Sequence, residues 1–117
     1  MSIEINKTKQ AHHESMEKGF LIIPKDLLYT ELTLLEVLVY SYLKDKIELS
    51  KKNSNFFDIE RMEYYCVVSN QELMDFIECG KTKTIQIKNN LEKKGLIKQV
   101  RQMDKSNKIF VYDYKIK

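Results

Sequence analysis

The pattern of apolar residues predicts that the first long helix begins after Thr33. Most residues between positions 34 and 43 are apolar, and they cover much of a helix circumference, which is typical of a central, buried helix. Thr33 and Glu36 have the spacing of a capping box, in which a hydroxyl and a carboxylate each accept a hydrogen bond from a backbone amide at the helix start. The polar residues 51–55 predict a loop after this helix.

Two shorter apolar stretches flank this helix. Residues 20–25 contain an apolar run that meets Pro24, the single proline of the chain, and proline disfavours helix at the preceding residue, so an extended segment is expected. Leu27 and Leu28 then start a short turn that packs on the domain. Residues 62–68 are rich in aromatic and β-branched side chains and predict a strand, in which Cys66 is a small core residue.

The remaining patterns predict two further helices and a hairpin. Ser69 and Glu72 form a second capping box at the start of one helix, and Gly80 is expected to end it. A third helix is expected over about 82–94, ended by Gly95. After Gly95, Leu96 and Ile97 lead into a strand expected near 97–102, and the apolar residues at 109–112 predict the returning strand. The polar residues 103–107 between them are expected to form a hairpin loop.

This order of elements predicts the fold class. Two helices joined by a short glycine-containing turn form a helix-turn-helix unit, and the hairpin that follows is its wing. The fold class is therefore α+β, a winged helix-turn-helix with a C-terminal β-hairpin wing. Residues 1–19 are polar without a sustained apolar period and are expected to form a flexible tail or arm, so the winged-helix domain comprises residues 20–117.

The third predicted helix has two chemically different faces. On a helical wheel Thr84, Ile87 and Leu91 lie toward the core, with Ile85 at the margin. Lys88 lies close to this apolar stripe and is expected to extend its ammonium group to solvent from the edge. The opposite side carries hydroxyl, amide and ammonium groups, from Thr82, Lys83, Gln86, Asn89, Asn90 and Lys93.

These groups suit contacts with duplex DNA. Gln and Asn can make paired hydrogen bonds to adenine, and Lys can reach guanine acceptors or phosphates. Residues near the N-terminal end of a recognition helix usually contact bases, and Lys81, in the turn before the helix, is expected to bind phosphate. The hairpin adds basic candidates, which are Lys98, Arg101, Lys105 and Lys108.

Charge is unevenly distributed and supports the same surface. The formal net charge of the chain is +3. Residues 1–68 carry a net charge of −2 and residues 69–117 a net charge of +5. The window 79–111, which contains the third helix and the hairpin, holds 9 basic and 2 acidic residues. Clustered positive charge is typical of a surface that meets polyanions.

Other classes of function have little support in the sequence. No phosphate-cradling glycine loop, HExxH or CxxC pattern occurs, so the chain is not expected to be an enzyme or to hold a cofactor. His12 and His13 are adjacent, without further ligands at metal-binding spacing. No apolar run is long enough to cross a membrane and no leader pattern opens the chain. Cys66 and Cys79 are therefore expected to be reduced thiols in a cytoplasmic protein.

The ordered set of features resembles a known family over residues 20–112, the N-terminal winged-helix domain of the RepA_N family of plasmid replication initiators. The matching residues are Ile23-Pro24-Lys25 and Leu27; Leu32-Thr33 with Leu38, Tyr40 and Leu43; Leu49-Ser50 and Lys52-Asn53; Gln71-Glu72-Leu73 and Cys79; Leu91 with Gly95-Leu96-Ile97; and Arg101-Gln102, Lys105, Asn107, Ile109 and Val111. The chain departs from the family pattern at Lys88, where an apolar residue is expected, and in its shorter wing loop.

The resemblance implies sequence-specific binding to double-stranded DNA, at repeated sites in a replication origin, by a domain that associates as a dimer. It adds Asn107 to the wing contacts Arg101, Lys105 and Lys108, and it implies the helix contacts Lys81, Thr82, Lys83, Gln86, Asn89 and Asn90. Other replication or regulatory proteins are possible partners.

Three alternatives remain open at this stage. The same chemistry would serve a stand-alone transcriptional regulator of phage or plasmid origin, which a complete 117-residue chain would favour. A winged-helix inhibitor whose main partner is a protein would use the acidic first half and exposed aromatic residues such as Phe56 and Phe57. Binding to single-stranded DNA would use aromatic residues to stack bases.

Overall fold

The computed structural model describes residues 21–114, in which short helices and two small antiparallel sheets surround one long helix. The first elements are the 3-10 helix η1 (Lys25–Tyr29), the long helix α2 (Leu34–Ser50) and the 3-10 helix η2 (Ser54–Phe56). Three short strands follow, β1 (Phe57–Asp58), β2 (Glu63–Tyr64) and β3 (Cys66–Val67). Helices α3 (Asn70–Ile77) and α4 (Lys81–Lys93) then precede strands β4 (Ile97–Val100) and β5 (Lys108–Val111).

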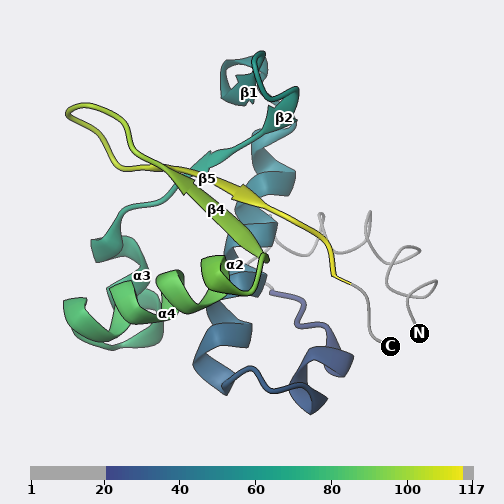
Figure 1. The fold of residues 1–117 in the computed structure, drawn as a ribbon, viewed down its shortest axis with the longest axis vertical. Coiled ribbons are helices and arrows are strands. Elements are labelled where there is room, and N and C mark those ends of the chain that lie inside the picture. The colour runs from purple at the N-terminus through teal and green to yellow at the C-terminus, as the bar shows by residue number, and fades with distance from the viewer. Residues whose placement is uncertain (1–20, 115–117) are drawn as a thin grey trace.

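The expected α+β, winged helix-turn-helix fold is confirmed. Helices α3 and α4 are joined by a three-residue turn, and β4 and β5 form the antiparallel hairpin that follows them. Strand β3 pairs with β5 on its other edge, which gives the sheet order β3-β5-β4. Figure 1 shows this sheet crossing α2, with α3 and α4 on one side and the β1–β2 hairpin projecting beyond the end of the sheet.

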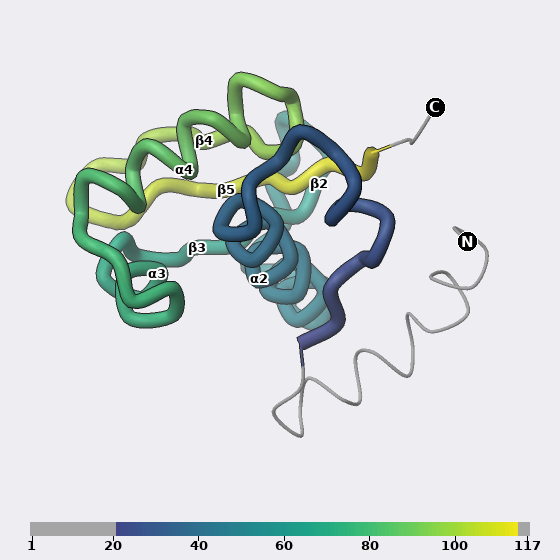
Figure 2. Tube along the Cα trace, turned by 90° about the horizontal axis from the view of Figure 1, so that it is seen from below, coloured from purple at the N-terminus to yellow at the C-terminus, as the bar shows by residue number. Residues whose placement is uncertain are grey.

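Helix α2 is the centre of the core, as its apolar pattern predicts. Val37, Val39, Tyr40 and Leu43 are completely buried, and the helix contacts α3, α4 and the sheet. Figure 2, which looks nearly along α2, shows those elements gathered on one side of it. The Tyr40 hydroxyl donates a hydrogen bond to the main-chain oxygen of Tyr112 at 2.6 Å, which links α2 to the chain just after β5.

The two predicted capping boxes have different outcomes. At α2 both halves are present, because Thr33 Oγ1 accepts from the Glu36 amide at 3.2 Å and Glu36 Oε1 accepts from the Thr33 amide at 3.1 Å. At α3 only the Ser69 hydroxyl plays its part and accepts from the Glu72 amide at 3.0 Å. The Glu72 carboxylate instead meets α2, where it accepts from the Tyr42 hydroxyl and pairs with Lys46 at 3.1 Å.

The single strand predicted over 62–68 is wrong in detail. It is divided at Tyr65, because Glu63–Tyr64 pairs with β1 whereas Cys66–Val67 pairs with β5 in the other sheet. Cys66 is buried as expected, and burial raises the pKa of its thiol to about 12. The thiol is therefore protonated near neutral pH, which agrees with a packing role.

Glycine ends only one of the two predicted helices. Gly95 has a φ of +81° and follows α4, as expected of a C-terminal glycine. Helix α3, in contrast, ends at Glu78, which itself adopts the left-handed conformation with a φ of +54°. Gly80 has an extended conformation because it is already the N-cap of α4, so the turn is too short for it to serve both helices.

The N-terminal predictions are met only in part. Pro24 is extended, and the η1 turn buries Leu27, but Leu28 is 48% exposed and does not pack. The predicted arm at 1–19, with His12 and His13, lies outside the described residues.

Candidate nucleic-acid interface

Helix α4 is fixed by its inner face. Thr84, Ile87 and Leu91 are buried, as the helical wheel predicts. The Thr84 hydroxyl donates to the Gly80 carbonyl oxygen at 2.9 Å, so this buried polar group is satisfied within the helix. The apolar residues pack against α2, α3 and β4, which determines which side of α4 faces outward.

The outward face carries most of the predicted helix contacts. Six of them are exposed, namely Lys81, Thr82, Lys83, Gln86, Asn89 and Lys93. Thr82, Gln86, Asn89 and Lys93 follow a helical spacing of three or four residues and therefore form one stripe along α4. Beside the stripe, Gln99 of β4 donates to Asn89 Oδ1 at 3.4 Å and to Glu92 Oε1 at 2.7 Å.

The first turn of α4 carries positive charge and no acidic residue. Gly80 provides no side chain to accept hydrogen bonds from the first amides of the helix, and the first turn contains Lys81 and Lys83 but no acidic residue. Unpaired amides already give a helix N-terminus a partial positive charge. Adding two ammonium groups there is unfavourable for the isolated helix, so this end of α4 is suited to bind a phosphate-bearing ligand.

Asn90 differs from its prediction, because its side chain turns inward. It is half-buried, and its amide donates to Glu36 Oε2 at 3.1 Å. Glu36 is only 4% exposed and also pairs with Lys94 at 3.6 Å. Burial favours a raised pKa for this carboxyl group, but hydrogen bonds from Thr33 and Asn90 and the charge of Lys94 outweigh it and lower the pKa. Glu36 therefore ties the start of α2 to the C-terminal half of α4.

The wing extends in the same direction as the N-terminal half of α4. Both point to the left in Figures 1 and 2. Arg101 and Lys105 are exposed in the loop between β4 and β5, and Asn107 is half-buried. The Gln102 amide donates to the Ser106 carbonyl oxygen at 2.9 Å and closes the loop internally.

Two predicted wing residues do not join this surface. Successive side chains of a strand point to opposite faces of a sheet, so Lys98 lies on the face opposite Gln99, which contacts α4. Lys108 is half-buried, pairs with Asp58 of β1 at 3.4 Å and lies 4.6 Å from the centre of the Tyr65 ring. Lys108 thus connects the base of the wing to the β1–β2 hairpin.

Lys88 also differs from its prediction. It does not reach solvent from the edge of α4 but is 6% exposed, and its ammonium group donates to Asn70 Oδ1 of α3 at 2.8 Å. The sequence carries no local signal for Asn70, Glu36 or Gln99 as partners of α4, because each bond depends on how separate elements pack.

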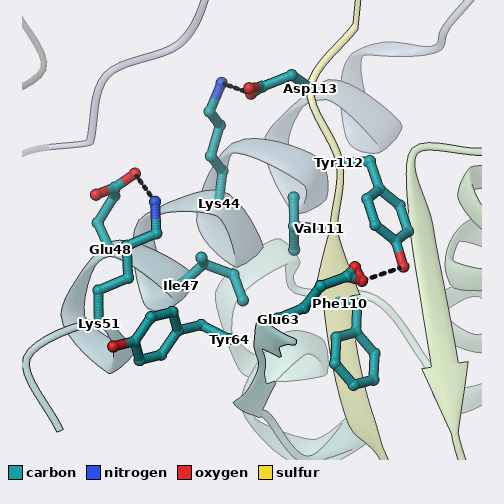
Figure 3. A pocket seen from close by; sticks show the side chains of 10 residues that line it. All are labelled: Lys44, Ile47, Glu48, Lys51, Glu63, Tyr64, Phe110, Val111, Tyr112 and Asp113. Carbon is teal, nitrogen blue, oxygen red and sulfur yellow. Dashed lines mark hydrogen bonds and ion pairs between the residues drawn. The ribbon is translucent and has the colours of Figure 1, made fainter. Parts of the chain in front are cut away.

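A pocket of about 300 Å³ lies elsewhere, between the C-terminal half of α2, strand β2 and strand β5. Figure 3 shows polar side chains that line it paired with one another, namely Lys44 with Asp113 at 3.1 Å, Lys51 with Glu48 at 3.3 Å and the Tyr112 hydroxyl with Glu63 at 3.1 Å. None of the predicted contact residues lines it. Residues 21–114 contain no group of three or more potential metal ligands, and within that range no helix is both long and apolar enough to cross a membrane.

The chain is similar to one known protein family and to several solved structures. The family model described as Replication initiator protein A (RepA) N-terminus, RepA_N, matches residues 19–117. A solved structure described as "N-Terminal domain of DNA binding protein" is 33% identical, with a TM-score of 0.68, over 89% of this chain and 82% of that chain. A search of curated protein sequences gave no significant match.

Two further solved structures are similar. One, described as "Structure of Rep-DNA complex", is 33% identical with a TM-score of 0.67, over 89% of this chain and 82% of that chain. The other, described as "Structure of MDR initiator", is 28% identical with a TM-score of 0.68, over 89% of this chain and 84% of that chain.

Proposed function

The chain belongs to the RepA_N family of replication initiators, and on that premise we propose that it is a non-catalytic domain that binds specific sites in double-stranded DNA through α4 and the β4–β5 loop. The observation that carries this proposal is the exposed face of α4, which combines amide side chains with an electropositive N-terminus that has no acidic residue in its first turn. A similar chain, at 33% identity, is described as a Rep–DNA complex.

The proposed contacts have two different tasks. Gln86 and Asn89 lie on the exposed stripe, and side chains of these types can discriminate bases in the major groove by paired hydrogen bonds. Lys81 and Lys83 at the helix start, and Lys105 in the wing loop, supply ammonium groups for phosphates, which fix position without reading sequence. Thr82, Lys93, Arg101 and Asn107 complete the proposed surface. Asn90, Lys98 and Lys108 are left out of it.

The proposed DNA target is a set of repeated sites in the replication origin of a plasmid or mobile element, bound by a dimer of the domain. A stand-alone transcriptional regulator would use the same α4 surface. The two roles differ in where the preferred sites lie, in an origin or in a promoter, so the sequences that the domain selects from a randomised duplex pool distinguish them when mapped on its own replicon.

The alternative of a protein inhibitor has lost one of its two supports. It relied on the acidic first half and on exposed aromatic residues such as Phe56 and Phe57, but both of these side chains are half-buried. Their rings pack edge to face against Tyr65 and Tyr64, with centroid distances of 5.9 and 4.9 Å. The aromatic side chains of this region are therefore used inside the domain.

Gln86→Ala is expected to weaken binding to the selected duplex by about 1–3 kcal/mol, the value of a bidentate base contact, while random duplex is bound as before. Lys105→Ala is its matched control, because a phosphate contact is lost equally on every sequence. Fluorescence anisotropy titrations of both duplexes at one salt concentration measure the difference. Equal losses on selected and random duplex with Gln86→Ala would contradict its assignment as a base-reading residue.

A further inference from the structure

Lys88 of α4 is the most deeply buried basic side chain within residues 21–114, and its ammonium group bonds to a side chain of α3. Lys88, the eighth residue of α4, is 6% exposed and donates to Oδ1 of Asn70, the first residue of α3, at 2.8 Å. Around this bond the α3–α4 contact is apolar, through residues such as Leu73, Ile77 and Ile87.

An ammonium group at this place is costly. Burial lowers the pKa of Lys88, because the charged form loses its hydration. Replacement of buried ion pairs by apolar side chains of similar volume is often neutral or stabilising, and the hydrogen-bond acceptor of Lys88 is only the neutral amide of Asn70. Packing alone therefore does not explain a lysine on the inner side of α4.

A directional bond does something that apolar packing does not. Apolar contacts are non-directional, so they allow small rotations of α4 about its axis and small slides along α3. A hydrogen bond requires a defined distance and angle between its two groups. The proposed base-reading residues are Gln86, two positions before Lys88, and Asn89, one position after it. They rotate together with Lys88 because the helix moves as one body.

We infer that Lys88 is a positioning residue for DNA recognition, whose bond to Asn70 holds α4 in the one rotation that presents Gln86 and Asn89 to the bases. This inference rests on the proposed function. It concerns the discrimination between sequences, since phosphate contacts by flexible lysine side chains tolerate a small rotation, whereas paired hydrogen bonds to a base require placement within about 0.5 Å.

The test uses Lys88→Met, which keeps the length of the side chain and removes the charge. The measured quantities are the midpoint of urea unfolding and the ratio of affinities for duplex selected by the wild-type protein and for random duplex. We expect the midpoint to stay unchanged or to rise and the ratio to fall about tenfold, within the usual range for coupled residues. Asn70→Ala, which leaves the ammonium group buried without its acceptor, is expected to lower both the midpoint and the ratio.

Thr84→Val is the matched control, because it replaces another buried polar group of α4 whose bond stays within the helix. Its ratio is expected to equal that of the wild-type protein. An unchanged ratio with Lys88→Met overturns the inference, as does a ratio that falls only where the midpoint falls, since that is the behaviour of a purely structural residue. If the wild-type protein itself does not distinguish the two duplexes, the proposed function fails, and that result is separate from failure of the Lys88 inference.

Discussion

Glu36→Ala is expected to lower the free energy of unfolding by about 3 kcal/mol. The substitution removes half of the capping box of α2, a loss of about 1 kcal/mol. It also leaves the half-buried Asn90 amide without its acceptor, a further loss of about 1–3 kcal/mol. It also separates Lys94 from its carboxylate partner. Urea unfolding at neutral pH measures the change. Glu31→Ala, an exposed glutamate just before α2, is the control and is expected to change stability by less than about 0.5 kcal/mol.

The contribution of Glu36 also depends on pH in a defined direction. Its pKa is lowered in the folded protein, so the folded state binds fewer protons at this group than the unfolded state. Its stabilisation is therefore complete above the ordinary glutamate pKa of about 4.3 and is lost as the pH falls through the lower, folded value. The stability difference between the wild-type protein and Glu36→Gln is expected to shrink below about pH 4 for this reason.

The pH at which each carboxyl group titrates distinguishes Glu36 from Asp45. Burial raises the pKa of Asp45 to about 6, so Asp45 titrates at a higher pH and does so in both proteins. A stability difference between wild type and Glu36→Gln that stays constant from pH 7 to pH 3 or so would show that the carboxylate is not the stabilising form.

Reversal of the two charges at the start of α4 has the largest expected effect on binding. Lys81→Glu with Lys83→Glu is expected to reduce affinity for any duplex on the order of a hundredfold at about 0.1 M salt, because phosphate contacts dominate affinity and are replaced by repulsion. The same exchange is also expected to favour the free helix slightly, because acidic residues suit a helix N-terminus. Loss of binding would then occur in a domain that is no less stable.

The matched control for this variant carries the same change of net charge. Lys51→Glu with Lys52→Glu alters two exposed lysines in the loop after α2, outside the proposed surface. Band-shift titrations at two salt concentrations compare the double variants with the wild-type protein. Comparable losses in both double variants would mean that net charge, and not the α4 surface, controls binding.

The parts of the fold that could be predicted from the sequence have local causes. The Thr33 cap of α2, the glycine after α4 and the inner face of α4 each depend on residues a few positions apart, and each is present. The division of the strand at Tyr65 has no such local cause. It follows from two different partner strands, one of them more than 40 residues away in sequence.

The same distinction explains which side chains lie elsewhere than the sequence predicts. The exposed stripe of α4 follows from helical period, so Gln86 and Asn89 could be predicted. Asn90, Lys88 and Lys108 are held by partners 54, 18 and 50 residues away, which are Glu36, Asn70 and Asp58. Lys and Asn side chains are equally suited to DNA and to such internal bonds, and composition does not separate the two uses.

In the proposed function, the exposed stripe of α4 and the wing loop together contact duplex DNA. An NMR titration of the ¹⁵N-labelled domain with its selected duplex tests it most directly, because every non-proline residue reports through its own backbone amide. We expect the largest shift changes at residues 81–89 and 101–105, with little change at Ile47 and Tyr64 in the pocket. Changes concentrated at the pocket or the β1–β2 hairpin, with the start of α4 unaffected, would contradict it.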